Sequence, residues 1–187
     1  MAKNTPARTK KARGAKKDPQ ERPRGRARTG SATRATSAAD AANAWRQRVS
    51  KDAQETIDTM MAHVQAVAEE QLGRYGAFPA FLVTARKDGE YELDALAPEQ
   101  LEQLAPEAAL EALRAKAAQL RDEVLCAGVA FPVTLPDRSG QTAVAVELEH
   151  REGEALMVVL PYRVKGAERS VGFGDASVDP ATRWLWP

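Results

Sequence analysis

Large hydrophobic residues begin abruptly in this chain, at Trp45. No Val, Ile, Leu, Phe, Tyr or Trp precedes Trp45, so the residues before it cannot build a core. From Trp45 on, apolar positions recur at steps of three and four, which predicts one face of a long helix. Its members are Trp45, Val49, Ala53, Ile57, Met60, Val64, Val67 or Ala68, and Leu72.

Start and stop signals flank this predicted helix. The segment Ser37-Ala38-Ala39-Asp40 has capping-box spacing, with Asp in place of the usual Glu. Ser50 offers a second start, which would break the apolar stripe into two helices. The helix ends at Gly73 or Gly76, because glycine readily takes the left-handed conformation that follows a helix.

The middle of the chain predicts a hairpin followed by helix. Residues 78–84 and 90–93 are rich in aromatic and aliphatic side chains, and the turn signal Asp88-Gly89 lies between them. Pro98 and Pro106, each followed by glutamate, mark two helix starts, since proline is favoured at the first helical position. The second helix carries an apolar edge that suits packing on a sheet: Leu110, Leu113, Ala117, Leu120 and Val124.

Alternating apolar residues dominate the last third of the chain. They occupy residues 129–135, 144–148 and 156–162, and turn signals lie at 137–140 and 151–154. Pro161 and Gly166 end the third strand, and Val171 and Phe173 predict a short last one. Short turns make these strands antiparallel. We therefore predict an α+β fold: a long N-terminal helix, a β-hairpin, a second helix and an antiparallel β-meander, with the helices on one face of the sheet.

Charge divides the chain close to the point where hydrophobic residues begin. Residues 1–36 carry a net charge of +10 and residues 37–187 a net charge of −9, which together give the +1 of the whole chain. High like-charge density without apolar residues is typical of disorder. The sequence therefore predicts a disordered basic tail, 1–36, and a single α+β domain, 37–187.

The basic tail is a candidate polyanion-binding segment, because each cation that meets a phosphate releases a counterion. It has no aromatic residue to stack on a base, so such binding would be blind to sequence. Two other interpretations stay open: a solubilising tail, and a tail that folds back on the acidic domain. The candidate polyanion-binding residues are Lys10, Lys11, Arg13, Lys16, Lys17, Arg22, Arg24, Arg26 and Arg28.

Composition narrows the location and the chemistry. The single cysteine, Cys126, cannot form an internal disulfide or a cysteine-based zinc site, which suits a reducing compartment. It lies in an apolar run and is interpreted as a small buried hydrophobe. The strongest apolar run, residues 155–160, is too short to span a membrane, and no apolar segment follows the N-terminal charges as a secretory signal would require. We expect a cytoplasmic protein.

Several short motifs resemble an uncharacterised family of small bacterial α+β proteins. The matching residues are Phe78-Pro79-Ala80 with Asp88-Gly89, Glu147-Leu148-Glu149-His150, Gly153, Pro161-Tyr162 and Phe173-Gly174. The resemblance covers about residues 50–187 and omits the tail. It implies the fold and implies no activity.

The richest set of candidate chemical groups is Glu147, Glu149, His150, Glu152 and Glu154. Strand alternation places Glu147 and Glu149 on one face, about 6–7 Å apart at roughly 3.3 Å per residue, and His150 on the other. These groups diverge, so we expect no metal, cofactor or catalytic site here. We interpret the two carboxylates as solvated and His150 as a hydrogen-bonded residue at a strand end.

Two tryptophans close the chain, in Trp184-Leu185-Trp186. They are interpreted either as a terminal segment packed on the sheet or as a hydrophobic anchor for a partner, since tryptophan is enriched at interface hot spots. The sequence therefore favours a non-enzymatic cytoplasmic protein that acts through protein contacts, with a basic partner suited to the acidic domain. The alternative is an accessory nucleic-acid binder that uses the basic tail.

Overall fold

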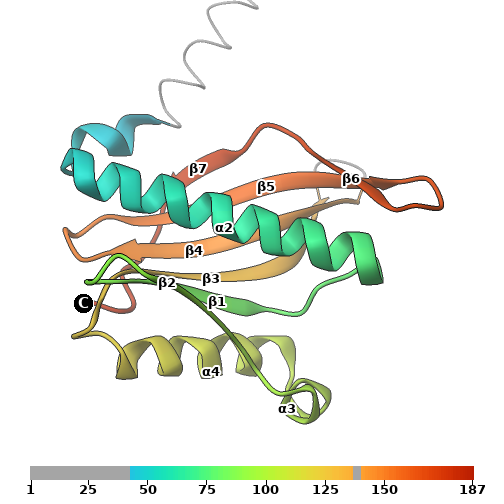
Figure 1. Cartoon of the computed structure of the whole chain (residues 1–187), viewed down its shortest axis with the longest axis horizontal. Coiled ribbons are helices and arrows are strands. Elements are labelled where there is room, and N and C mark those ends of the chain that lie inside the picture. Colours follow the sequence, from blue (N-terminus) through green and yellow to red (C-terminus); the bar gives the residue numbers. More distant parts are fainter. Residues whose placement is uncertain (1–42, 137–139) are drawn as a thin grey trace, which may run out of the picture.

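The predicted hairpin and meander join into one curled antiparallel sheet (Figure 1). The computed structural model describes residues 43–136 and 140–187, so the basic tail and the Ser37–Asp40 box lie outside the described residues. The strand order is β2-β1-β3-β4-β5-β6, and β7 pairs with β5. The strands are β1 Phe81–Arg86, β2 Tyr91–Ala95, β3 Val124–Leu135, β4 Gln141–His150, β5 Ala155–Lys165, β6 Ser170–Phe173 and β7 Ser177–Pro180.

Most local signals in the sequence are confirmed. Gly89, with φ of 92°, lies in the turn of the β1–β2 hairpin, and β3 to β6 form a meander. Proline begins both α3 (Pro98–Gln103) and α4 (Pro106–Gln119). The short strand predicted at Val171 and Phe173 is β6, whereas nothing in the sequence pattern indicated β7.

The long first helix starts later than its apolar stripe suggests. Trp45 lies in a short 3₁₀ turn, η1 (Ala44–Gln47), and α2 runs from Lys51 to Tyr75. The alternative start at Ser50 is confirmed, because its hydroxyl accepts a hydrogen bond from the Ala53 N–H. Gly76 ends α2 with φ of 76°, in the left-handed conformation.

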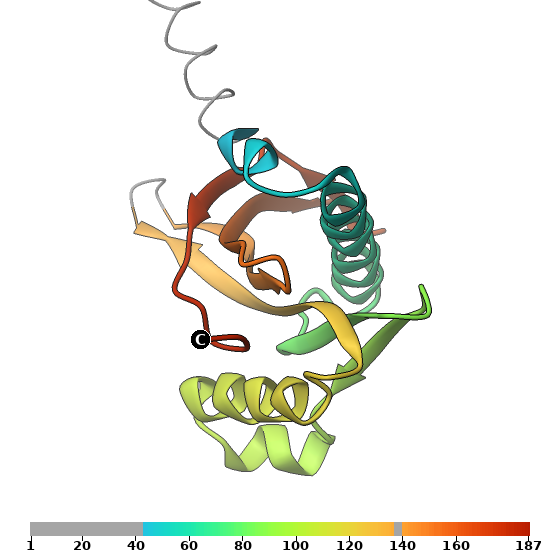
Figure 2. The same ribbon diagram turned by 90° about the vertical axis from the view of Figure 1, so that its left-hand side faces the viewer.

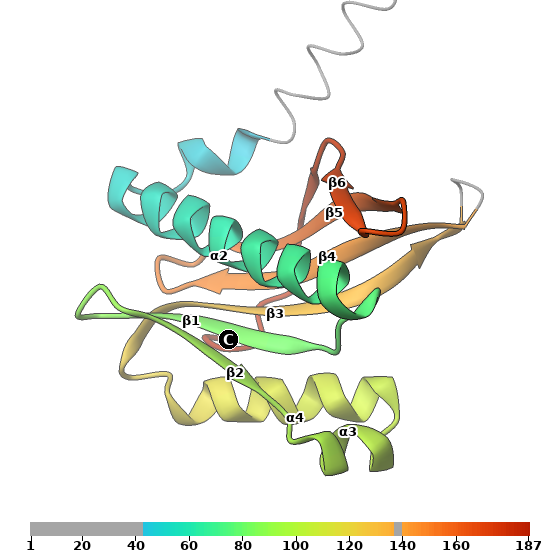
Figure 3. The ribbon, with the colours of Figure 1, turned by 45° about the vertical axis from the view of Figure 1, so that its right-hand side comes forward.

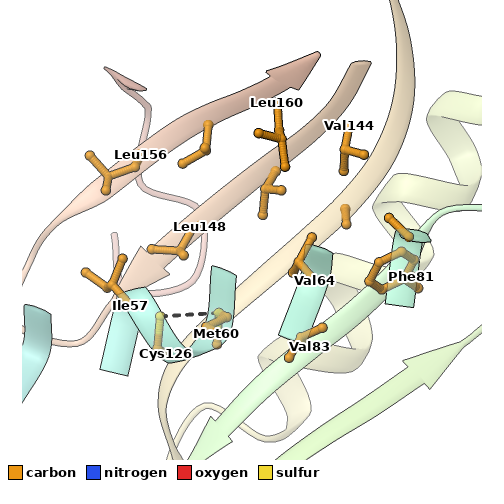
Figure 4. Close-up of a cluster of buried hydrophobic side chains, with 14 of the residues drawn as sticks. Ile57, Met60, Val64, Phe81, Val83, Cys126, Val144, Leu148, Leu156 and Leu160 are labelled. Carbon is orange, nitrogen blue, oxygen red and sulfur yellow. Dashed lines mark hydrogen bonds between the residues drawn. The ribbon is translucent and has the colours of Figure 1, made fainter. Parts of the chain in front are cut away.

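Helices cover both faces of the sheet, so the prediction that they share one face is wrong (Figure 2). Successive residues of β1 show the reason: Val83 packs in the cluster under α2, and Leu82 packs in the cluster under α4. In the first cluster, Ile57, Met60 and Val64 point from α2 toward the sheet (Figure 4). The second cluster joins α4 to the C-terminal segment through Leu113 and Leu185. The sheet is therefore the middle layer of three.

The predictions for Val124 and Pro161 are wrong. Val124 begins β3 and does not continue α4, which ends at Gln119. Pro161 lies inside β5 and does not end it. Its carbonyl accepts from the Gly174 N–H, on the side where the partner of β5 changes from β7 to β6. N–H and C=O of one residue in an antiparallel strand point the same way, so the missing N–H of Pro161 breaks no bond to β4.

Cys126 is fully buried, as its apolar neighbours indicate. Its thiol lies 3.6 Å from the Met60 sulfur, and burial raises the pKa of the thiol above its ordinary value. Among the described residues, no helix has the length and apolar content that a membrane crossing requires.

Candidate functional site

Glu149 is a fully buried carboxylate that binds the C-terminal segment. Its Oε2 accepts hydrogen bonds from the N–H groups of Trp184 (2.7 Å) and Leu185 (2.6 Å). Its Oε1 accepts from the N–H of Trp186 (3.1 Å) and from Arg183 Nε (2.9 Å). Four donors thus replace the water that a carboxylate loses on burial. The interpretation of Glu149 as solvated is wrong, although its shared face with Glu147 is confirmed by the contacts of both side chains.

The two C-terminal tryptophans lie on either side of Leu185, whose N–H makes the shortest of these hydrogen bonds. Leu185 is buried in the cluster under α4, and Trp184 and Trp186 pack against the same cluster half-buried. The indole Nε1 of Trp184 is buried without a hydrogen-bond partner among the described residues. The segment therefore packs on its own domain, and an anchoring role for the tryptophans toward a partner stays a prediction.

Glu147 binds α4 as Glu149 binds the C-terminal segment. Arg114 on α4 donates to Glu147 Oε2 through Nε (3.0 Å) and through its second terminal nitrogen, and it also pairs with Glu111. Burial alone would lower the pKa of Arg114, but the hydrogen bonds and charges of both glutamates outweigh it and raise that pKa. One oxygen of each carboxylate, Glu147 Oε1 and Glu111 Oε2, accepts no hydrogen bond within the described part of the chain.

A groove of about 700 Å³ lies between α4 and the C-terminal segment. Glu147 on β4 and Met157 on β5 are register partners and form its floor. Ala115 and Ala118 leave room along α4, and Trp184 forms part of the opposite wall. Two carboxylates and one guanidinium give the groove a net negative charge. Its lining residues are Glu111, Arg114, Ala115, Ala118, Glu147, Met157, Pro180, Ala181, Thr182 and Trp184.

Two other members of the predicted set, Glu152 and Glu154, fix the start of α2. Arg48 binds the buried Glu154 through two hydrogen bonds. Glu152 accepts from the Ser50 N–H (2.8 Å) and hydroxyl (2.6 Å), and these bonds lower the pKa of Glu152. The β4–β5 turn therefore holds Ser50, the N-cap residue of α2, in place.

His150 has a structural environment at the end of β4. Its Nδ1 accepts from the Glu152 N–H at 3.2 Å, as the interpretation of a hydrogen-bonded strand-end residue requires. Burial lowers the pKa of His150, and the nearby charge of Glu152 opposes this shift only in part. A neutral imidazole with Nδ1 as acceptor fits both observations.

The structure thus divides the predicted set in two. It places Glu147 in the groove and Glu149 under the C-terminal segment, whereas Glu152 and Glu154 lie at the helix start and His150 binds the Glu152 N–H. Residues 43–136 and 140–187 contain no group of three or more His, Cys, Asp or Glu placed to hold a metal ion. The nine candidate polyanion-binding residues, from Lys10 to Arg28, lie outside the described residues.

Sequence reasoning did not identify Arg114 or the Pro180–Thr182 wall as parts of a site. The spacing of Glu111 and Arg114 indicates an ion pair on one helix face, but nothing local links Arg114 to Glu147 on β4. Comparison of the chain with protein-family models, curated proteins and solved structures yields no match. The resemblance to an uncharacterised bacterial family stays a prediction.

Proposed function

We propose that this chain is a non-enzymatic protein that acts through protein contacts, and that its groove takes an Arg or Lys side chain of a basic partner. The groove itself carries the proposal. It combines an indole wall with two carboxylates, each of which keeps a free oxygen. A long cationic side chain has an apolar stem, which can pack on the indole, and a charged end, which can pair with the carboxylates.

The acidic stretch of the chain that contains α4 supports a basic partner. Between Asp88 and Glu123 the chain carries ten Asp or Glu and only three Lys or Arg. All ten carboxylates except Asp94 are exposed. Such a field raises the association rate of a basic partner and disfavours acidic ones.

The environments of the candidate catalytic glutamates favour a role in binding over a role in catalysis. Glu149 is saturated by the C-terminal segment, and Glu152 and Glu154 hold the start of α2. Glu147 retains one oxygen, but its neighbour in the groove is the positively charged Arg114. The second oxygen of this carboxylate can serve as a hydrogen-bond acceptor for a ligand.

Filling the groove tests this proposal. We expect Ala115→Trp to weaken binding of a fluorescein-labelled nona-arginine peptide by about tenfold or more, equivalent to about 1.4 kcal/mol. The reason is that Ala115 lines the groove and is exposed, so an indole there occupies the space without disturbing the core. Fluorescence anisotropy with the full chain at low salt measures the dissociation constant.

The matched control is Ala108→Trp, which places the same indole on an exposed position of α4 that does not line the groove. This control should bind the peptide within about twofold of the unsubstituted chain, since surface substitutions have small effects. Equal weakening by both variants, or no binding by the unsubstituted chain, would contradict the proposal.

A further inference from the structure

The outer edge of β2 is an unpaired sheet edge. β2 pairs only with β1, and Figure 3 shows it as the outermost strand beside α3 and α4. The Arg86 N–H donates to the Glu90 carbonyl, so strand alternation turns the backbone groups of Tyr91, Leu93 and Ala95 outward. Among the described residues, these outward groups bind only one partner, the Lys116 ammonium on the Ala95 carbonyl (3.2 Å).

The side chains of this edge differ on its two faces. Leu93 is 55% exposed on the face toward α2, where a further strand would cover it. Glu90, Glu92 and Asp94 alternate with it and share the other face. Charges on an edge strand usually discourage strand addition. Here all three are acidic and the strand itself carries no cation. Arg86 pairs with Glu92 and Lys116 pairs with Asp94, but the edge still favours a basic strand over an acidic one.

The N-terminal tail of this chain contains a segment with the complementary pattern. Arg22, Arg24, Arg26 and Arg28 occur at every second position, and small residues such as Gly25 and Ala27 separate them. An extended backbone would place the arginines on one face and the small side chains on the other. This segment lies outside the described residues, and the connection from Arg28 to Asn43 reaches about 50 Å at about 3.3 Å per residue.

We propose that residues 25–29 add to the outer edge of β2 as an antiparallel strand within the same chain. Opposing Ala27 to Leu93 places Arg26 opposite Asp94 and Arg28 opposite Glu92. Pro23, which has no N–H to donate, then falls beyond the end of β2. Backbone hydrogen bonds provide the affinity of such strand addition, and the alternating charges set its register. This inference uses a different surface from the groove and stands independently of it.

The short connection makes this contact effective even when each bond is weak. A connection of this length that reaches β2 gives the segment an effective concentration there in roughly the millimolar range. The acidic edge is thereby covered by the chain's own arginines, and a basic partner must compete with them.

Disulfide trapping in the full chain tests the register. In Ala27→Cys/Leu93→Cys the two thiols face each other across the proposed pair, whereas Ala27→Cys/Val164→Cys pairs the tail with an exposed residue of β5, across the sheet from β2. Cys126 is buried and stays in the chain. Under oxidised glutathione at low salt, we expect the first disulfide to form roughly tenfold faster than the second, because only the first pair is held together.

Two further measurements sharpen the test. Replacing Arg24, Arg26 and Arg28 with Gln should remove this rate difference, and so should about 0.5 M NaCl, which screens charges beyond a few ångströms. Equal rates for the two cysteine pairs at low salt would overturn the proposal. A disulfide-linked dimer in place of an internal loop would also overturn it, because the tail would then occupy the edge of a second copy.

Discussion

Glu149→Gln is expected to lower the free energy of unfolding by about 3–5 kcal/mol, the range found when one partner of a buried charged network is removed. The substitution keeps the shape of the side chain but replaces one acceptor oxygen with an NH₂ group. That NH₂ group would face N–H donors that now bind Glu149, and the Arg183 guanidinium would lose its counter-charge. Urea unfolding followed by tryptophan fluorescence measures the change.

Glu147→Gln is the matched control for this prediction. It is the same substitution on the same strand face, two residues earlier, but the Glu147 side chain is 18% exposed and pairs with a single arginine. We expect a loss of about 1 kcal/mol or less, the usual value for a partly exposed ion pair. A loss from Glu149→Gln as small as that expected for Glu147→Gln would show that the C-terminal segment does not depend on Glu149.

Leu185→Ala is the substitution with the second largest expected effect. Leu185 is 2% exposed in the cluster under α4, so removing three carbons leaves a cavity, at a cost of about 2–5 kcal/mol. A loss of about 3 kcal/mol corresponds to a melting temperature roughly 6–12 °C lower for a domain of this size. Thermal unfolding followed by circular dichroism checks it.

The control for Leu185→Ala is Leu93→Ala, the same change at a leucine that is 55% exposed. It should change the free energy of unfolding by about 0.5 kcal/mol at most. If Leu185→Ala also left the melting temperature unchanged, the C-terminal segment would not be part of the folded core. The tryptophans would then be free to act only as an anchor for a partner.

Local signals predicted much of this fold because each acts over a few residues. Ser50 supplies a hydroxyl to the first turn of α2, Gly76 takes a positive φ, and Asp88-Gly89 closes a hairpin. The face of the sheet that each helix covers is not set by such local signals. It depends on the pairing of β1 with β3, strands about forty residues apart in sequence. A periodic pattern gives the orientation of side chains within one strand and not the neighbour that the strand will choose.

The groove was only partly predictable for the same reason. Alternation correctly placed Glu147 and Glu149 on one face, but their different environments come from two distant segments. Arg114 lies 33 residues before Glu147, and the N–H groups that bury Glu149 lie 35 to 37 residues after it. Backbone N–H groups leave no mark in the sequence, so a carboxylate that they bury looks like any other glutamate on a strand.

We propose above that the groove between α4 and the C-terminal segment binds a basic side chain. Titrating the isotope-labelled full chain with nona-arginine, and following its amide and indole NMR signals, tests this claim most directly. We expect the largest shifts for the amides of Ala115, Ala118, Met157 and Thr182 and for the indole N–H of Trp184, because these five residues line the groove. Saturating shifts confined to another face, or no shifts at these positions, would contradict it.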